Sequence, residues 1–478
     1  MHQLPLGRTI PSLALALAFA FAGSLAGCGR VLSGGSSGSN GAALEGNASM
    51  EAAGLPAFPG AQGFGANAVG GRGGTVYEVT NLDDSGAGSL RDAVEAKGPR
   101  IVVFRVDGTI EQHEPLKITH PYLTIAGQSA PGGGITLSGE EVRVQTHDVV
   151  IRHLRIRTGD VVTPVDGWDN RDAMNFGAPD NVGGTYKVVI DHCSLSWAVD
   201  ETFTTWYQTH GITLQNSILS EPLFHSKHPK GPHSMGILIG DGSYQISIHH
   251  NLIADVNGRS PQVGDSGIVD YRNNIVYNWG EYAALFKTPG QKINFVANGY
   301  QAGPDAGTSF TPCAVKLHTD ATNLQLCIED NFDPVCTQPT DDNWDMVVWT
   351  TDLPVTDTSL RRSSEFDHPA TTTMDVVHAY AYVLEYAGAT KPERDAIDAR
   401  IVSDVQNGTG GIIDSPADVG GWVTMWKGTP PADADHDGMP DTWETAHGLN
   451  PNDKSDSAKD RNGDGYSNVE EYLNALAR

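Results

Sequence analysis

Two stretches near the carboxyl terminus carry oxygen-bearing side chains at the spacing of a metal-binding loop. Each has Asp or Asn at positions 1, 3, 5 and 9, Gly at position 6 and Glu at position 12. Hard oxygen ligands around a glycine turn are what Ca²⁺ requires, so we predict two calcium loops that fold only with their ion. An acidic, solvated tail would not place both glycines and both glutamates at this spacing. The predicted ligands are Asp433, Asp435, Asp437, Asp441 and Glu444 in the first loop, and Asp460, Asn462, Asp464, Asn468 and Glu471 in the second.

A second group of charged residues lies in the middle of the chain. Asp200 and Glu201 follow a short strand pattern, and Asp172 lies about one repeat earlier. Arg259 follows a later strand by a comparable distance. Equivalent positions on stacked strands are about 4.8 Å apart, so carboxylates that are distant in sequence can meet around one cation. We therefore expect a cation site beside an arginine.

The element that would bring these residues together is a strand that recurs about every 23 residues, a period typical of repeat architectures. In five copies, two apolar residues alternate with polar ones before a small or amide residue. Short strands repeating at this spacing indicate a solenoid in which each coil buries one face against the next. The copies begin at Val188, Ile212, Ile246, Val269 and Ile293, and the interval between the second and third copies is the longest. We predict an all-β fold, a right-handed single-stranded parallel β-helix followed by a small calcium-loop module.

Asparagines recur at the ends of three of these strands, at Asn251, Asn274 and Asn298. Stacked amide side chains can satisfy one another's donors and acceptors where the backbone bends. The pattern therefore predicts an internal asparagine ladder.

The composition suits a long solenoid. The chain has 478 residues, with 55 glycines and 27 prolines for many turns, and a solenoid is not bound by the usual limit on core size. The formal net charge of −27 argues against nucleic acid or an anionic membrane surface as the main partner. A polyanionic substrate would need cations to mediate its binding.

The amino terminus has the features of an export signal. A short apolar run precedes Leu25-Ala26-Gly27-Cys28, which resembles a bacterial lipobox. We predict a lipoprotein signal peptide over residues 1–27, lipidation at Cys28 and a flexible tether over residues 28–54. The alternative is a simple signal peptide with a chance cysteine. Residues 55–427 would form the β-helix domain, with late helices at 374–386 and 392–405, and residues 428–478 the calcium module.

Cysteine and histidine leave two further questions. An exported protein could pair two of Cys313, Cys327 and Cys336, and the sequence does not indicate which two. Several histidines invite comparison with zinc sites, but no pair has the helical spacing of a metalloprotease, and His192, His249 and His250 lie within the repeating strands, where capping or packing roles are more common. The histidines that invite this comparison are His192, His225, His228, His233, His249 and His250.

Five segments together resemble the pectate lyase family. They are residues 79–91, 100–104, 190–196, 249–253 and 259–261. The resemblance extends from about residue 55 to residue 422 and implies a right-handed parallel β-helix that cleaves pectate by Ca²⁺-dependent β-elimination. The carboxy-terminal loops resemble the calcium repeats of dockerins and thrombospondin type 3 modules.

The resemblance also implies roles for the central residues. Ca²⁺ would bridge Asp172, Asp200 and Glu201 to the substrate carboxylate, and Arg259 would occupy the family's base position. Because an arginine ordinarily keeps its proton, we expect the ion and either Lys230 or Arg272 to make its surroundings more positive. We also predict Lys230 and Arg272 as substrate-binding residues. The alternative is that Arg259 only forms an ion pair or orients the substrate.

Three positions depart from the family pattern. Thr204 stands where a second aspartate is expected, Met235 where a substrate-binding lysine is expected, and Gly264 where a second arginine is common. Lys227 or Lys230, in the loop that lengthens the interval between the second and third strand copies, could supply the missing lysine charge.

We therefore predict an exported, lipid-anchored pectate lyase at a bacterial cell surface or secreted, acting as a monomer on de-esterified homogalacturonan (polygalacturonate) with Ca²⁺. One alternative is a lyase of the same fold for methylated pectin or another acidic polysaccharide. Another is a non-catalytic β-helix that only binds polysaccharide. We expect no nucleic-acid partner, and membrane contact only through the lipid anchor.

Overall fold

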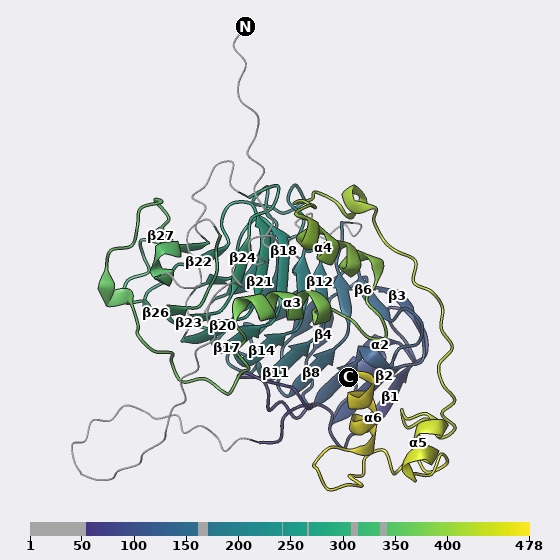
Figure 1. The fold of residues 1–478 in the computed structure, drawn as a ribbon. Coiled ribbons are helices and arrows are strands. Elements are labelled where there is room, and N and C mark those ends of the chain that lie inside the picture. The colour runs from purple at the N-terminus through teal and green to yellow at the C-terminus, as the bar shows by residue number, and fades with distance from the viewer. Residues whose placement is uncertain (1–53, 161–170, 241, 265–266, 307–313, 335–341) are drawn as a thin grey trace, which may run out of the picture.

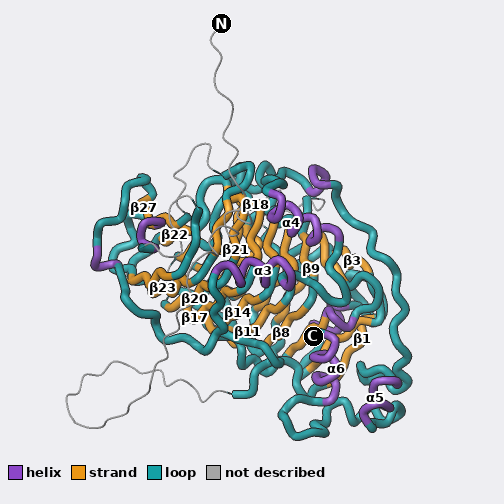
Figure 2. The backbone as a smooth tube through the Cα atoms, in the orientation of Figure 1, coloured by secondary structure: helices purple, strands orange, loops and turns teal. Residues whose placement is uncertain are grey.

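Three parallel sheets, here named A, B and C, form the body of the protein (Figures 1 and 2). The computed structural model describes residues 54–160, 171–240, 242–264, 267–306, 314–334 and 342–478. A central coil contributes one short strand to each sheet in turn, and strands of successive coils pair in parallel. This arrangement is a parallel β-helix and confirms the predicted fold.

The strands are short, because each coil must turn between the three sheets before it stacks on the next coil. Sheet A contains β1 (Thr75–Val79), β2 (Arg100–Phe104), β5 (Leu123–Ala126), β8 (Val149–Arg152), β11 (Tyr186–Asp191), β14 (His210–Gln215), β17 (Tyr244–His249), β20 (Ile268–Arg272), β23 (Lys292–Val296) and β26 (Gln325–Glu329). Sheet B contains β3 (Gly108–Glu111), β6 (Ile135–Ser138), β9 (Arg155–Arg157), β12 (Ser194–Ser196), β15 (Ile218–Ser220), β18 (Leu252–Val256), β21 (Ile275–Trp279) and β24 (Gly299–Gln301). Sheet C contains β4 (Leu116–Ile118), β7 (Val142–Val144), β10 (Met174–Phe176), β13 (Glu201–Thr205), β16 (Met235–Ile239), β19 (Gln262–Val263), β22 (Ala284–Phe286), β25 (Val315–Leu317) and β27 (Val347–Trp349).

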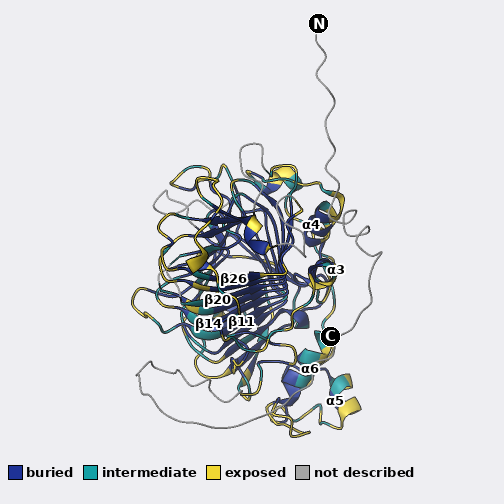
Figure 3. Ribbon diagram, turned by 60° about the vertical axis from the view of Figure 1, so that its left-hand side comes forward, coloured by how far each residue is buried: buried dark blue, intermediate teal, exposed yellow. Residues whose placement is uncertain are grey.

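The five predicted strand copies are neighbouring strands of sheet A, and their first apolar residues pair in register. Val188 pairs with Ile212, Ile212 with Ile246, Ile246 with Val269, and Val269 with Ile293. All five side chains are fully buried in one core that runs the length of the coils (Figure 3). The long interval between Ile212 and Ile246 holds an extended loop between β15 and β16.

The asparagine ladder forms at the turn between sheets A and B. The Nδ2 of Asn251 donates to Oδ1 of Asn274 at 3.0 Å, and Nδ2 of Asn274 donates to Oδ1 of Asn298 at 3.2 Å. Two members that were not predicted, Asn331 and Asn343, extend the ladder. Because these amides are buried, each coil fixes the position of the next through paired donors and acceptors.

Helices cover the sheets from outside (Figure 1). The late helices begin after the capping residues Asp375 and Asp395, a few residues later than predicted. The helices are α2 (Leu90–Glu95), α3 (Val376–Tyr386), α4 (Ala396–Asn407), α5 (Asp441–His447) and α6 (Asn468–Leu476). Among the described residues, no helix is long and apolar enough to cross a membrane.

Buried ion pairs attach α4 to sheet B. Arg157 donates to Oδ2 of Asp395 at 2.6 Å and to Oδ1 of Asp398 at 2.7 Å. Burial alone would raise the pKa of Asp395, but the charge and hydrogen bonds of Arg157 lower it to about 2. The guanidinium and both carboxylates are almost fully shielded from solvent, so each charge depends on its partner.

We expect Asp395→Ala to lower the free energy of unfolding by about 3–5 kcal/mol, because it leaves buried arginine charge uncompensated. Urea unfolding followed by circular dichroism measures this change. Asp404→Ala is the control: it removes a partly exposed pair with Arg400 on the same helix and should cost about 1 kcal/mol or less. Equal losses in the two variants would contradict the importance of the buried pair.

Candidate functional site

The three central carboxylates lie together at the edge where the strands of sheet C begin. Asp172 precedes β10, Asp200 precedes β13, and Glu201 is the first residue of β13. β10 and β13 pair with Met174 opposite Phe203. One ligand oxygen of each carboxylate lies within 4.8 Å of the others. We name this group, with Glu141 described below, the acidic edge.

Asp172 is buried, with 4% of its surface exposed. Its Oδ1 accepts a hydrogen bond from the backbone N–H of Glu201 at 3.0 Å, and its Oδ2 accepts one from Asn175 at 2.8 Å. Burial, followed by the charges of Glu141 and Asp200, raises the pKa of Asp172 well above its ordinary value. A cation would relieve this repulsion.

Glu141 is a fourth carboxylate that the sequence analysis missed. It stands directly before β7, one coil ahead of Asp172, and is 3% exposed. Burial raises its pKa, and Arg143 opposes that shift. Its place before a strand of sheet C is the signal that could have identified it.

Two histidines from the extended loop hold Asp200. The Nε2 of His233 lies 2.5 Å from Oδ1 of Asp200, and Nε2 of His228 lies 3.3 Å from Oδ2. Their rings stack with centroids 3.8 Å apart. Burial would raise the pKa of Asp200, but the hydrogen bond from His233 and the charges of the two histidines lower it. Neither histidine was given a role from the sequence, and both contact the acidic edge.

Arg259 reaches the acidic edge from two coils away. Ile237 N–H donates to the carbonyl of Arg259, which places Arg259 beside β16, and β16 in turn pairs with β13. The guanidinium forms an ion pair with Glu201, and its side chain is 16% exposed. The structure therefore brings Arg259 to the predicted carboxylates.

The other predicted cations are not equivalent. Lys230 is exposed and follows His228, so its charge lies near the acidic edge. Arg272 ends β20 of sheet A, where it is buried and paired with Asp270 and Glu365. The placement of Arg272 beside Arg259 is wrong, because Arg272 lies in the repeating strand that begins at Val269, on sheet A, whereas Arg259 lies beside β16 of sheet C.

The departures from the family pattern have clear structural positions. Met235 is buried at the start of β16, opposite Glu201. Thr204 lies inside β13 with a buried hydroxyl that has no hydrogen-bond partner. Gly264 follows β19, and a Cβ there would lie 3.1 Å from the carbonyl oxygen of Ile239.

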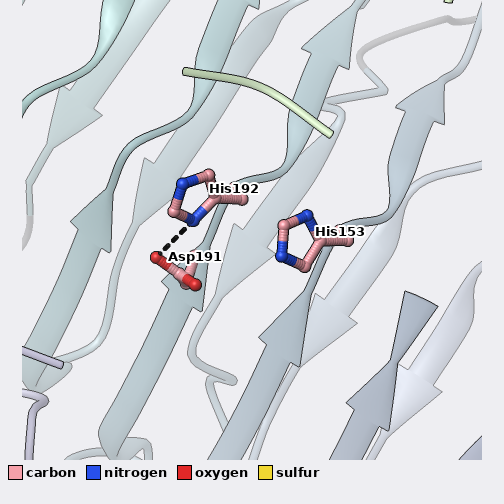
Figure 4. A group of neighbouring side chains, drawn as sticks. All are labelled: His153, Asp191 and His192. Carbon is pink, nitrogen blue, oxygen red and sulfur yellow. Dashed lines mark ion pairs between the residues drawn. The ribbon is translucent and has the colours of Figure 1, made fainter. Parts of the chain in front are cut away.

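A separate imidazole and carboxylate group lies at the turn from sheet A to sheet B (Figure 4). His192 Nδ1 lies 2.8 Å from Oδ1 of Asp191, and the His153 ring stacks 4.9 Å from that of His192. Asp191 also accepts hydrogen bonds from Arg152, Gln215 and Asn216. Because Arg152 already neutralises this carboxylate, the group is a weaker cation site than the acidic edge.

The first calcium loop has the arrangement of an ion cage. Asp433 accepts backbone hydrogen bonds from His436 and Gly438, at 2.9 and 3.1 Å, and Gly438 adopts φ +90°. Both carboxylate oxygens of Glu444 are buried without a partner. Burial and the neighbouring carboxylates raise the pKa of Asp437 to about 7 and that of Glu444 to about 8. Asp441 accepts from the backbone of Ala434.

The second calcium loop is more open. Asp460 accepts hydrogen bonds from the backbone of Gly463 and Gly465, and Gly465 adopts φ +96° as position 6 requires. Asn462 donates to Asp464, whereas Asn468 accepts from the backbone of Arg461. Glu471 forms an ion pair with Arg461 at 2.9 Å. This loop has the turn, but one buried carboxylate oxygen without a partner, Oε1 of Glu471, where the first loop has several.

The remaining sequence predictions divide by location. Cys327 is a buried free thiol that donates to Glu329 at 2.8 Å. Cys313 and Cys336 lie outside the described residues, as do Cys28, the signal peptide over residues 1–27 and all but the last residue of the tether.

The acidic edge fits a hard divalent cation, because buried carboxylates from adjacent coils converge there and repel one another. Arg259 adds a donor that can contact an acidic substrate. The first loop fits Ca²⁺ for the same reason. These are two distinct candidate ion sites, one on sheet C and one in the carboxy-terminal module.

Comparisons with known proteins identify relatives across most of the chain. A probable pectate lyase C of Aspergillus flavus is 36% identical over 434 residues, covering 88% of this chain and 94% of that protein. The corresponding protein of Aspergillus fumigatus is 37% identical over the same length and coverage. A solved Bacillus subtilis pectate lyase matches with a TM-score of 0.48 and 13% identity, over 72% of this chain and 100% of that chain. No family model matches the chain. The extent of the Aspergillus matches shows that the chain belongs to the pectate lyase family and is a polysaccharide lyase.

Proposed function

We propose that the protein cleaves de-esterified homogalacturonan by Ca²⁺-dependent β-elimination, with Arg259 as the base. The observation that carries this proposal is the convergence of Asp172, Asp200 and Glu201 at one edge of sheet C, with Arg259 paired to Glu201. Family membership supports the substrate class, since the Aspergillus relatives are described as probable pectate lyases.

The difficulty of the reaction lies in removing the C5 proton of a galacturonate, because the carbanion forms beside a carboxylate that is already negative. Asp172, Asp200 and Glu201 would hold Ca²⁺, which supplies positive charge to that carboxylate and acidifies the proton. His228 and His233 keep the Asp200 carboxylate in position. Arg259 is paired with Glu201, so Glu201 would have to leave this ion pair for Arg259 to accept the proton.

The carboxy-terminal loops extend the proposal to structural calcium. Asp433, Asp435, Asp437, Asp441 and Glu444 would hold one ion, and Asp460, Asn462, Asp464, Asn468 and Glu471 a second. The unpartnered oxygens of the first loop support this assignment more directly than the exposed second loop does.

Export is also part of the proposal, and it rests on the amino-terminal sequence alone. Lipidation of Cys28 stays a prediction, because residues 1–53 are outside the described part of the chain. The Aspergillus relatives give it no support, since a lipobox is a bacterial signal and these relatives are fungal. Monomeric state likewise stays a prediction.

Purified protein should release unsaturated product from polygalacturonate in Ca²⁺ and none in chelator, because the acidic edge needs its ion. Ultraviolet absorbance follows the product, with highly methylated pectin as the second substrate. Chelator-insensitive cleavage of methylated pectin would favour the alternative lyase. Absence of product from both substrates would exclude a lyase for either form of pectin.

Arg259→Ala should keep the fold and lower kcat on polygalacturonate by at least about 100-fold, the loss typical of a missing proton acceptor. Arg361→Ala, which removes a more exposed arginine paired with Asp342, is the matched control and should retain activity. Near-normal turnover by Arg259→Ala would leave Arg259 with only its ion-pair role.

In chelator, the thermal unfolding midpoint should fall as pH rises from about 5 to 8. The raised pKa values of Asp437, about 7, and Glu444, about 8, mean that the folded loop binds protons that the unfolded chain has released above about pH 4.5. Stability from this source is therefore present at low pH and lost through that window.

Differential scanning calorimetry at constant ionic strength measures the midpoint. Ca²⁺ should remove most of the fall by neutralising the loop, and Glu444→Gln should reduce it in chelator. A midpoint that rises with pH in chelator, with no difference between Glu444→Gln and the parent, would refute the interpretation.

A further inference from the structure

A carboxylate from outside the first calcium loop faces the loop's ion cage. Asp456 lies between the two loops in sequence and is 6% exposed. Its Oδ2 accepts a hydrogen bond from the backbone N–H of Asn450 at 3.1 Å, whereas its Oδ1 is buried without a partner. The charge of Asp456 also contributes to the raised pKa of Asp435, Asp437 and Glu444. Leu449 N–H donates to the carbonyl of Glu444 at 2.9 Å, so the hydrogen bond from Asn450, the next residue, holds the Asp456 carboxylate beside the end of α5 that carries Glu444.

The same place gathers other buried oxygens that lack partners. Both oxygens of Asp435, both of Glu444 and Oδ2 of Asp437 are buried and unpartnered. Asp437 and Glu444 are fully buried. Leaving several buried carboxylate oxygens without donors is costly, and a bound cation is the common explanation.

The second loop does not compete for Asp456. Its first ligand, Asp460, is exposed and already accepts backbone hydrogen bonds. Its last ligand, Glu471, is paired with Arg461 through Oε2, and only its Oε1 is buried without a partner. The unpartnered oxygen of Asp456 is therefore available to the same ion as the unpartnered carboxylates of the first loop.

The first loop is itself part of an interface with the β-helix. Met439, at position 7 of the loop, is fully buried in a cluster with Val76 and Val103 of the first coils. A Cβ on Gly438 would lie 2.9 Å from Cγ1 of Val76, so the loop backbone packs directly on sheet A. Arg105 lies 3.8 Å from the loop ligand Asp433.

Helix α6 completes this interface. Val469 and Leu473 pack in the same cluster as Met439, and Glu470 forms an ion pair with Arg72 at 3.0 Å. Figure 1 shows α6 lying beside β1 and β2. Residues from opposite ends of the described chain therefore meet here.

We infer that Asp456 is a sixth side-chain ligand of the first loop, and that the ion it encloses locks the carboxy-terminal module onto the first coils of the β-helix. The inference rests on the proposed calcium binding by this loop. When the ion is absent, Asp435, Asp437, Glu444 and Asp456 repel one another. Opening of the loop then withdraws Met439 from the apolar cluster.

Calorimetric titration of the full chain with Ca²⁺ tests the ligand. Glu444→Gln identifies the heat of the first loop, which should disappear in that variant. Asp456→Asn keeps an acceptor for Asn450 and should weaken this site at least about tenfold. Asp453→Asn, whose carboxylate pairs with Ser455 and Lys459, is the matched control and should change it less than about twofold.

The outcomes separate the inference from the proposal beneath it. If no heat is lost in Glu444→Gln, the proposed calcium loop is wrong. If that heat is present and Asp456→Asn binds as tightly as the control, the ligand role of Asp456 is wrong.

Hydrogen exchange tests the lock in the unmodified chain. Chelation should reduce the protection of amides in α6 and in β1 and β2 together, by at least about tenfold, and Ca²⁺ should restore it. Amides of β17 and β20 report on the distant coils and should stay unchanged. Equal protection of α6 with and without Ca²⁺, in a chain whose first loop binds the ion, would overturn the lock.

Discussion

Parallel, in-register stacking of coils about 4.8 Å apart is the constraint on which this molecule depends. The buried asparagines enforce it at the turn between sheets A and B, because each amide donates to the next coil and accepts from the previous one. Slippage by one residue would break these bonds and turn the apolar residues outward. The positions of all side chains at the strand ends, including those of the acidic edge, therefore depend on this register.

The stacked coils also bring like charges close together, and the protein accommodates these charges in two ways. On sheet B, Arg155 and Arg157 of one strand are neutralised by Asp395 and Asp398 from the region of α4. At the acidic edge of sheet C, burial raises the pKa of Glu141, and burial together with the charge of Glu141 raises the pKa of Asp172. At this edge Glu141 pairs with Arg143 and Glu201 with Arg259, whereas Asp172 accepts hydrogen bonds from neutral donors.

The sequence predicted what depends on repetition. The alternation at Val188 and its successors identified the coils, and counting along them brought Asp172, Asp200 and Arg259 to one edge. Loops and long-range partners were beyond this reasoning. Nothing in the extended loop indicated that His228 and His233 would fold back on Asp200. The placement of Arg272 beside Arg259 failed for another reason: Arg272 belongs to the repeating strand on sheet A, whereas Arg259 lies beside sheet C.

Glu141 and Thr204 together suggest how this chain differs from the family pattern. The expected second aspartate is replaced by Thr204, whose hydroxyl is buried inside β13. Glu141 adds a carboxylate on the opposite side of Asp172, at the start of β7. Glu141 is itself paired with Arg143, so the negative charge that it adds beside Asp172 is partly compensated. Because Asp200 is also held by two imidazoles, we expect a cation at this edge to lie closer to Asp172 than to Asp200.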